Sequence, residues 1–448
     1  MAMNRRGFLQ ASSAWALSAA AARLSFAQPS TITLAAVGDC MVTRRISVLE
    51  SPRFLELVKL LRSSDVTFAN FEMTLADADA PPQYHEGCAY VHLRADSPEN
   101  QFIADELKWA GIKIVGLASN HSLDYGAPGL FSTIAKFDRA ALPHAGTGAN
   151  LAEARAPGYF DMAKGRVALV ACASTFPDWT QAADGNGEVA GRPGLNPVRL
   201  RTRYRVSPEQ LVSLRAIARS LGATVGAGPE LRFMGRTFVA GEPAGAEVAA
   251  DPEDTAAIVA SVRRASRNSD LVLMGIHAHE GGGSADVPSP FLQPLAHACV
   301  DAGTDAFIGH GPHVLRGIEI YKGKPIYYSL GNFIFHGESA KQIPAEIYRE
   351  CKVSGSDPSD VFDKVLPGFS AAPFWHTVVP VATFSAHKLT DLRLHPVTLN
   401  PRLSRSSRGT PELAQGDEAQ QIIAAIAKLS EPYGTRIRYD GRTGVVQL

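Results

Sequence analysis

Two histidines three residues apart lie in the run Ile308-Gly309-His310-Gly311-Pro312-His313-Val314. A strand-like run, 305–308, leads into this pair, and glycine and proline then turn the chain. Imidazoles that leave a strand end together can converge on a metal ion, because neutral imidazole is a common metal ligand. The alternative is a turn that carries two solvated histidines. This run alone leaves both interpretations open, so the rest of the chain has to decide.

Strand-like and helix-like runs alternate along the chain around this pair. Strands are expected at 31–37, 66–71, 112–118, 167–173, 271–276, 305–308 and 325–335, and helices at 54–61, 98–109, 128–139, 208–221, 252–267 and 291–302. This alternation predicts an α/β domain with a largely buried central sheet. The strands 377–384 and 389–398 are expected to form a closing hairpin, and 417–429 a late helix.

Five of the expected strands end in side chains that can bind a metal. The residues concerned are Asp39, Glu72, Asn120 with His121, His277 with His279 and Glu280, and His310 with His313. Ligands of α/β sheets bind beyond the carboxyl ends of the strands, so we expect these residues to share one composite site. Mixed Asp, Glu, Asn and His ligation suits zinc, manganese or iron and requires no thiolate.

Each of these residues also has an ordinary structural explanation. A carboxylate such as Asp39 or Glu72 often caps the next element. Asn120 could occupy a turn position with positive φ, and His277 could be a core histidine with satisfied hydrogen bonds. The occurrence of all of them at strand ends of one alternating chain favours the metal site.

The N-terminus predicts export. Arg5-Arg6-Gly7-Phe8-Leu9 is typical of a twin-arginine signal, and the apolar run 11–22 is shorter than the roughly 20 residues that span a bilayer. Ser25-Phe26-Ala27 offers small residues for cleavage, so residues 1–27 are interpreted as a Tat signal peptide. The alternative is an uncleaved amphipathic anchor. We expect a periplasmic or extracellular protein with no membrane span after signal cleavage.

Composition gives no reason to expect a nucleic-acid partner. The chain holds 44 basic and 44 acidic residues, and three of the arginines lie in residues 1–27, which leaves a net charge of −3 after cleavage. Such a balance offers no electrostatic attraction to nucleic acid or to an anionic membrane. The five cysteines contain no close C-x-x-C pair and predict no disulfide framework.

The mature chain is expected to form one main domain, residues 28–400. A Gly/Pro-rich stretch at about 177–251 is interpreted as an insertion in it, and residues 401–448 as a C-terminal extension.

The ligand-type residues lie in motifs that resemble a known family. These motifs are Gly38-Asp39, Asn70-Phe71-Glu72, Ser119-Asn120-His121-Ser122-Leu123-Asp124-Tyr125-Gly126, His277-Ala278-His279-Glu280, Gly309-His310-Gly311-Pro312-His313 and Tyr328-Ser329-Leu330-Gly331-Asn332-Phe333-Ile334-Phe335. With them the chain resembles the CapA family of capsule synthesis and poly-γ-glutamate biosynthesis proteins, which is similar in fold to the calcineurin-like metallophosphoesterases. The resemblance covers roughly residues 31–397.

The resemblance implies a four-layer α/β/β/α metallophosphatase-like sandwich with one or two divalent metal ions at one sheet edge. It implies that Asp39 binds a first ion and that Glu72 bridges two ions. It further implies that Asn120, His277 and His310 bind the second ion and that His313 returns to the first. His121 would act as a general acid or as an electrostatic stabiliser.

Three departures separate the chain from the metallophosphoesterase pattern. The first motif, usually Asp-x-His, reads Asp39-Cys40-Met41, so one ligand of the first site is missing. The last motif, usually Gly-His-x-His, has two residues between its histidines. Many CapA relatives have His-Trp-Gly where this chain has His277-Ala278-His279, so His279 could be an extra ligand or a second acid/base residue beside His121.

Three functions therefore remain open. The first is a metal-dependent hydrolase site that processes an anionic polymer such as poly-γ-glutamate, in which Arg44 and Arg45 could hold substrate carboxylates or phosphates. The second is a non-catalytic polymer-binding or export factor with a structural metal, working with capsule-assembly proteins. The third is a periplasmic phosphodiesterase or nucleotidase that acts on a small phosphorylated or carboxylated substrate.

Overall fold

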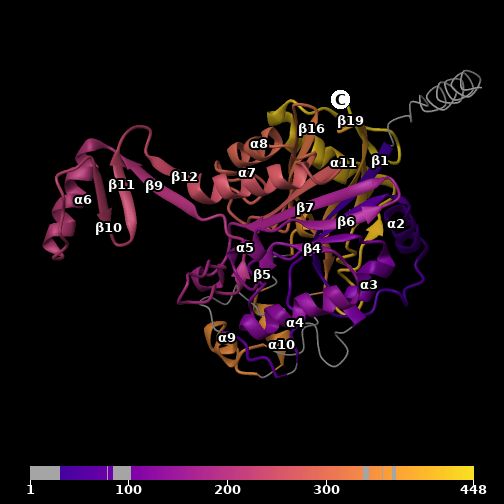
Figure 1. The fold of residues 1–448 in the computed structure, drawn as a ribbon, viewed down its shortest axis with the longest axis horizontal. Coiled ribbons are helices and arrows are strands. Elements are labelled where there is room, and N and C mark those ends of the chain that lie inside the picture. Colours follow the sequence, from indigo (N-terminus) through magenta and orange to yellow (C-terminus); the bar gives the residue numbers. More distant parts are fainter. Residues whose placement is uncertain (1–30, 78, 84–101, 337–342, 356, 366–369) are drawn as a thin grey trace, which may run out of the picture.

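The computed structural model describes residues 31–77, 79–83, 102–336, 343–355, 357–365 and 370–448 (Figure 1). The expected Tat signal, residues 1–27, lies outside the described residues. Among the helices that are described, none combines the length and the apolar character needed to cross a membrane.

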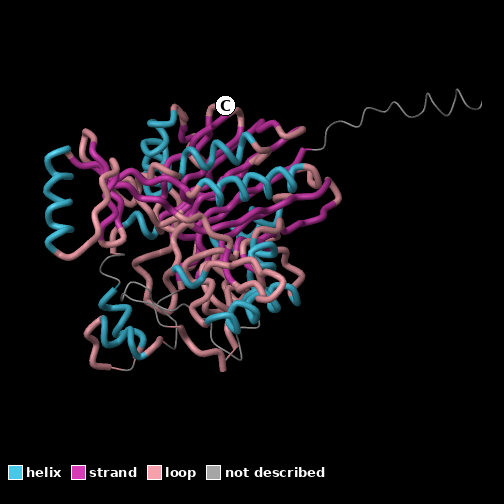
Figure 2. The backbone as a smooth tube through the Cα atoms, turned by 60° about the vertical axis from the view of Figure 1, so that its left-hand side comes forward, coloured by secondary structure: helices cyan, strands magenta, loops and turns pink. Residues whose placement is uncertain are grey.

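Two large mixed sheets form the centre of the molecule (Figures 1 and 2). The first follows the order β21 (Ile437–Tyr439), β22 (Gly444–Val446), β19 (Lys388–Thr398), β18 (His376–Ser385), β1 (Thr31–Met41), β2 (Val66–Phe71), β3 (Ile114–Gly116) and β4 (His144–Ala145). In the same sheet, β17 (Asn332–Phe335) pairs with β1, and β20 (Glu412–Leu413) pairs with β19. The second follows the order β15 (Leu315–Tyr321), β16 (Lys324–Leu330), β14 (Ala306–His310), β13 (Leu271–His277), β7 (Gly165–Ala173) and β6 (Gly158–Met162).

Helices cover the outer face of each sheet. On the first sheet, α2 (Pro52–Ser63), α3 (Ile103–Ala110) and α4 (Gly126–Arg139) share one buried apolar cluster with β1, β2 and β3. On the second, α7 (Pro252–Ser266) and α8 (Leu292–Asp301) do the same with β7, β13 and β14. A third cluster, with Leu34 and Phe68 from one sheet and Leu273 and Ile308 from the other, fills the space between the sheets. The expected four-layer α/β/β/α architecture is confirmed.

The predicted C-terminal extension packs against this core. Helix α11 (Gly416–Ser430) buries Ile422, Ile423 and Ile426 in the cluster between the sheets. Strands β20, β21 and β22 extend the first sheet beyond β19. The polypeptide after residue 400 thus contributes to the same sheet and the same core as the main domain.

A projecting arm lies within the predicted insertion. It comprises β9 (Leu200–Val206), α6 (Pro208–Ser220), β10 (Glu230–Phe233), β11 (Arg236–Ala240) and β12 (Gly245–Ala250), which form a separate sheet of order β10-β11-β9-β12. Figures 1 and 2 show this arm extending away from the sandwich. Its small core is built on Leu211, Ala218 and Leu231. Shorter elements are β5 (Thr147–Gly148) paired with β8 (Gly194–Leu195), α5 (Leu151–Ala154), α9 (Ala345–Glu350) and α10 (Pro358–Val365).

The single strand expected at 325–335 is wrong, because the chain changes sheets at Gly331. Strand β16 pairs with β14 in the second sheet, whereas β17 pairs with β1 in the first. Gly331 has a φ of 64°, which glycine adopts without strain. The oxygen of Gly331 accepts a hydrogen bond from the Asp39 backbone at 2.9 Å. A Cβ atom on Gly38 would lie 1.8 Å from the same oxygen, so this crossing also requires glycine at position 38.

Candidate metal centre

The sequence-predicted site residues meet where the carboxyl ends of parallel strands from both sheets come together. Asp39 lies near the end of β1 and Glu72 directly follows β2, which runs parallel to β1. His277 and His310 are the last residues of β13 and β14, and they face each other in the parallel register. Parallel strands place their carboxyl ends at one edge, and for this reason the strand-end residues form one cluster.

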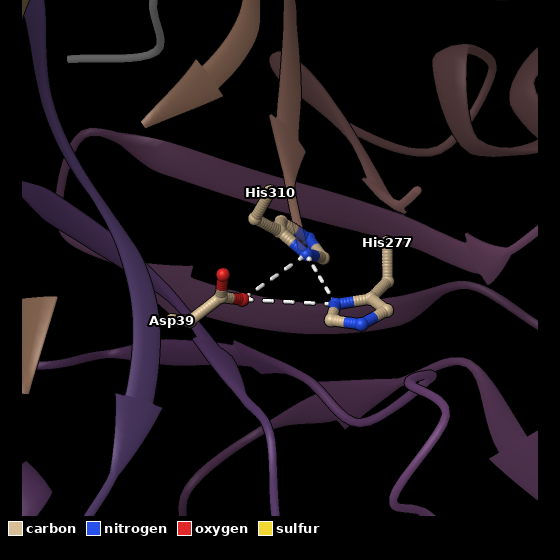
Figure 3. Close-up of side chains that lie close together, drawn as sticks. All are labelled: Asp39, His277 and His310. Atoms are coloured by element: carbon tan, nitrogen blue, oxygen red, sulfur yellow. Dashed lines mark hydrogen bonds and ion pairs between the residues drawn. The ribbon is translucent and has the colours of Figure 1, made fainter. Parts of the chain in front are cut away.

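Asp39, His277 and His310 form the buried centre of this cluster (Figure 3). One carboxylate oxygen of Asp39, Oδ1, lies 3.6 Å from Nδ1 of His277 and 3.6 Å from Nδ1 of His310. The two Nδ1 atoms are 3.2 Å apart. Three donor atoms of this kind, all turned toward one point, can hold a cation.

Glu72 supplies the strongest indication that a cation belongs here. Its side chain is fully buried, and both carboxylate oxygens lack a hydrogen-bond partner among the described residues. Oε1 lies 3.5 Å from Nε2 of His277 and 3.6 Å from Nε2 of His279, and Oε2 lies 3.7 Å from Nδ1 of His313. Burial raises the pKa of Glu72 well above its usual range, and the charges of Asp39 and Asp124 raise it further. A buried carboxylate without donors is costly unless a cation compensates it.

Asn120 and His279 complete the surroundings of His277. Nε2 of His277 lies 2.8 Å from Oδ1 of Asn120 and 2.9 Å from Nε2 of His279. Glu72, His277 and His279 thus form a second group of donor atoms that could hold an ion. His277 also belongs to the group with Asp39 and His310, so it joins the two groups, and Asn120 lies against it.

His313 takes part in a third group of donor atoms, together with Asp39 and Glu72. Its Nδ1 lies 3.9 Å from Oδ2 of Asp39 and 2.8 Å from Oδ1 of Asn332. The backbone of His313 has a φ of 60°, a left-handed conformation that is costly for residues other than glycine. Backbone strain of this kind persists where the surrounding structure holds it, and here it aims the imidazole at the centre.

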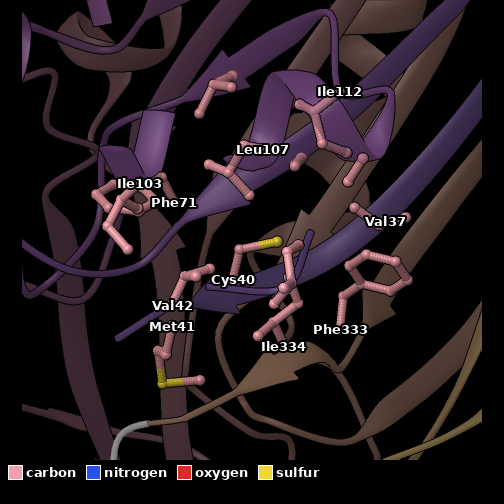
Figure 4. Close-up of a cluster of buried hydrophobic side chains, with 14 of the residues drawn as sticks. Val37, Cys40, Met41, Val42, Phe71, Ile103, Leu107, Ile112, Phe333 and Ile334 are labelled. Carbon is pink, nitrogen blue, oxygen red and sulfur yellow. The ribbon is translucent and has the colours of Figure 1, made fainter. Parts of the chain in front are cut away.

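Cys40 and Met41 lie away from the centre. Both side chains belong to the apolar cluster between β1 and its covering helices (Figure 4). The ligand that is missing from the Asp-x-His motif is therefore not replaced from β1. His313 approaches Asp39 and Glu72 from the second sheet instead.

The electrostatics of the centre favour ionised Asp39 and neutral His279, His310 and His313. Burial acts to raise the pKa of Asp39, but a hydrogen bond from His277 and the charges of the surrounding histidines outweigh it and hold this pKa well below its usual range. Burial lowers the pKa of His310 to about 3 and that of His313 to about 4. Burial also lowers the pKa of His279 well below 6.5. Neutral imidazole is the form that binds a metal.

His121 lies beside the ligand groups rather than in them. Its Nδ1 is 2.7 Å from Oδ2 of the fully buried Asp124, and its backbone oxygen accepts a hydrogen bond from Thr74. After burial, the charge of His121 is a minor cause of the lowered pKa values of His279 and His313, which places His121 near these two residues. The Asp124 partner fixes one ring nitrogen and leaves Nε2 as the atom that could act on a substrate.

Three supporting residues were not predicted as part of the site. Asn70 donates to Oδ1 of Asp39 at 2.7 Å, Asn332 contacts His313, and Asp124 orients His121. Each stands in a motif that carried the family resemblance, which is the signal that could have identified it. Arg44 donates to the backbone oxygen of Arg408 and Arg45 pairs with Glu106, so both arginines have partners within the protein, and a role in holding substrate stays a prediction.

The donor set fits a divalent transition metal. Carboxylate, imidazole and amide donors converge without a thiolate, a combination that suits zinc, manganese or iron. The unpartnered oxygens of Glu72 between three histidines agree with this chemistry, because a cation would satisfy both of them.

Comparisons with known proteins agree on the family. Residues 33–337 match the family "Bacterial capsule synthesis protein PGA_cap". Two uncharacterized proteins of Sinorhizobium fredii, y4sH and y4uA, are each 38% identical over 438 residues, which cover 93% of both chains. The "Capsule biosynthesis protein CapA" of Bacillus anthracis is 28% identical over 309 residues, 68% of this chain and 60% of the relative. The "PGA biosynthesis protein CapA" of Bacillus subtilis is 24% identical over 328 residues, 72% and 68% of the two chains. With the predicted fold and motifs in place, these matches show that the chain belongs to the bacterial capsule synthesis protein family PGA_cap.

Proposed function

We propose that this protein is exported and that it processes an anionic exopolymer of the poly-γ-glutamate type at a metal-dependent hydrolase site. The names of its Bacillus relatives support a role in capsule or poly-γ-glutamate biosynthesis. The observation that carries the catalytic part is the fully buried Glu72 carboxylate, whose unpartnered oxygens face three histidines.

Seven residues would hold one or two divalent ions. Asp39, Glu72 and His313 form one candidate group of ligands, and Glu72, His277 and His279 form another, with Asn120 beside His277. His310 would join through Asp39 and His277. When bound, ions in such a centre polarise the bond under attack and make water a nucleophile at neutral pH.

The residues of the chain itself would orient the substrate and move the proton. Asp124 accepts the Nδ1–H of His121 and fixes the plane of the ring. Nε2 of His121 would then give a proton to the leaving atom of an amide or a phosphoester as the bond breaks. His279 and His313 keep 29% and 13% of their side-chain surfaces exposed, so substrate would approach from their side.

A structural metal is the second candidate function, and burial of the centre favours it. Asp39, Glu72 and His277 are fully buried. Both ring nitrogens of His277 contact polar atoms of the protein, Nδ1 of His310 and Oδ1 of Asn120. Structural metal sites are closed by protein ligands, whereas catalytic sites keep a position for water or substrate. The protein would then grip or guide the polymer without cleaving it.

Metal content and cleavage test these two functions separately. Full-length protein purified from its native export route, without chelator, is expected to hold one or two equivalents of zinc, manganese or iron by elemental analysis. Glu72→Gln, which keeps the shape of the side chain but not its charge, is expected to lower metal affinity by roughly 100-fold, the scale of losing a buried charge partner. Absence of metal from the wild-type protein would contradict the proposed metal centre.

His121→Ala then distinguishes catalysis from polymer binding. Loss of poly-γ-glutamate cleavage with unchanged metal content supports the hydrolase. The matched control is His387→Ala, because His387 is a half-exposed histidine that also pairs with an aspartate, Asp305. Intact polymer function in His121→Ala together with loss in Asp39→Ala would favour the structural metal. Cleavage of small phosphodiesters alone would favour the phosphodiesterase alternative.

Export has its own test. Changing Arg5 and Arg6 to lysine is expected to retain the protein inside the cell, as measured by cell fractionation. Unchanged secretion of this variant would contradict the Tat assignment.

A further inference from the structure

Arg316 is a fully buried arginine that the catalytic proposal does not use. It lies in β15, and its side chain has no exposed surface. Its guanidinium donates to four backbone oxygens, those of Ala278, His279, Glu280 and Ala285, at 3.2, 3.1, 2.9 and 2.8 Å. All four oxygens belong to the segment 278–285, which leaves β13 directly after His277.

Hydrogen bonds to the backbone of this segment stabilise the positive charge of Arg316. Burial lowers the pKa of Arg316 to about 10, so the side chain remains charged at neutral pH. The charges of Glu280 and Asp286 act in the opposite direction to burial on this pKa, and no salt bridge joins either carboxylate to Arg316 within the described residues. A buried charge without a paired ion is expensive unless its donors are used in hydrogen bonds, and here four bonds converge on one short segment.

The same segment carries His279 and has little stiffness of its own. Gly281-Gly282-Gly283 follows directly after Glu280, and glycine restrains the backbone less than any other residue. The His279 N–H donates to the Thr175 hydroxyl at 2.9 Å, and the His279 oxygen accepts from Arg316. The main chain of His279 is therefore held from both sides, by Thr175 and by Arg316.

The contacts that hold the main chain of His279 place its imidazole beside His277 and Glu72. Nε2 of His279 lies 2.9 Å from Nε2 of His277 and 3.6 Å from Oε1 of Glu72, so it faces the same point as these donors. A metal ligand has to be kept in place within a few tenths of an ångström, and interactions outside the ligand shell usually provide this.

We propose that Arg316 is a positioning residue that clamps the segment 278–285 and thereby fixes His279 as a metal ligand rather than as an acid/base group. This inference rests on the proposed metal centre. It assigns His279 one of the two roles that the sequence left open.

Arg316→Lys is the first test, because lysine keeps the charge but cannot donate to four oxygens at once. Metal affinity, measured by titration of the metal-free full-length protein with Zn²⁺, is expected to fall 10- to 100-fold, the usual effect of losing a residue that supports a ligand. Amide hydrogen exchange in 278–285 is expected to rise in the same metal-free protein. Arg155→Lys, at an arginine that pairs with Asp254 outside the centre, is the control and should change neither quantity.

A double-mutant cycle tests whether Arg316 acts through His279. Arg316→Lys in a His279→Ala background is expected to change Zn²⁺ affinity less than twofold, because the ligand that the clamp positions is already absent. Independent, additive effects of the two changes would overturn the inference, as would unchanged affinity in Arg316→Lys alone.

A second variant keeps the inference testable if Arg316→Lys does not fold. Thr175→Val removes the acceptor for the His279 N–H with little change in shape, and a smaller loss of Zn²⁺ affinity is expected that also disappears in His279→Ala. Unchanged affinity in Thr175→Val would then count against the clamp. Zn²⁺ binding by wild type with no effect of these variants overturns the inference alone, whereas absence of binding by wild type overturns the proposed centre as well.

Discussion

At the scale of single residues, His313 combines a strained backbone with a place among the metal-ligand candidates. A left-handed φ costs most residues roughly 1–2 kcal/mol but is tolerated by asparagine. His313→Asn is therefore expected to be more stable toward urea than His313→Ala by about 1 kcal/mol. Both variants should lose metal affinity to a similar extent, as measured by Zn²⁺ titration. Equal stability of the two variants would show that the conformation of this residue is not strained.

His395 provides a test of pH dependence away from the metal centre. Burial, followed by the charges of Arg442 and Arg393, lowers the pKa of His395 to about 4. As the pH falls below about 6.5, the unfolded chain takes up a proton at this residue before the folded chain does, so acid destabilises the fold.

The free energy of unfolding is accordingly expected to fall more in wild type than in His395→Gln. The expected difference is about 2 kcal/mol between pH 7 and pH 4.5, since one pKa unit corresponds to ~1.4 kcal/mol. Urea unfolding of the metal-free proteins at the two pH values measures it. Parallel pH profiles for the two proteins would exclude this residue as a source of acid sensitivity.

At the scale of elements, the crossing of the chain from β16 to β17 fixes Asp39. A Cβ on Gly38 would clash with the oxygen of Gly331 and separate β1 from β17. Gly38→Ala is expected to lower the free energy of unfolding by about 2–3 kcal/mol. Gly245→Ala, at an exposed strand position with nothing within 4 Å of the added Cβ, is the control and should cost nothing. Urea denaturation of both variants makes the comparison.

The elements also show where sequence reasoning was sufficient. Helices and strands of the sandwich were predictable because their apolar spacing matches the faces they bury, as in the hairpin β18 and β19. The division of 325–335 into two strands was not predictable, since both halves are apolar and only Gly331 marks the change of sheet.

At the scale of the whole molecule, the arm is expected to be dispensable for the metal centre. Leu200 and Ala250 are register partners, so the two ends of the arm lie side by side. Replacement of residues 201–249 by a short Gly/Ser linker should leave a folded protein with unchanged metal content. A loss of about 1–3 kcal/mol is expected, because the deletion removes Val248, which packs against the core under α7.

Thermal unfolding and elemental analysis of this deletion check the prediction. Loss of metal with retained secondary structure would show that the arm contributes to the centre. Full loss of folding would show that the arm and the sandwich form a single cooperative unit.

The sequence by itself determined the alternation of strands and helices and the edge at which the ligands lie, because strand periodicity and the carboxyl-end rule depend on local pattern. The four layers were implied by the family resemblance. The sequence also named Asp39, Glu72, His277 and His310 as donors. Only the tertiary structure decided how these donors group, that Cys40 and Met41 turn into the apolar cluster, and that Arg316 holds the segment of His279. Those contacts join segments far apart in the chain, and their distances depend on how two sheets pack against each other, which local sequence does not encode.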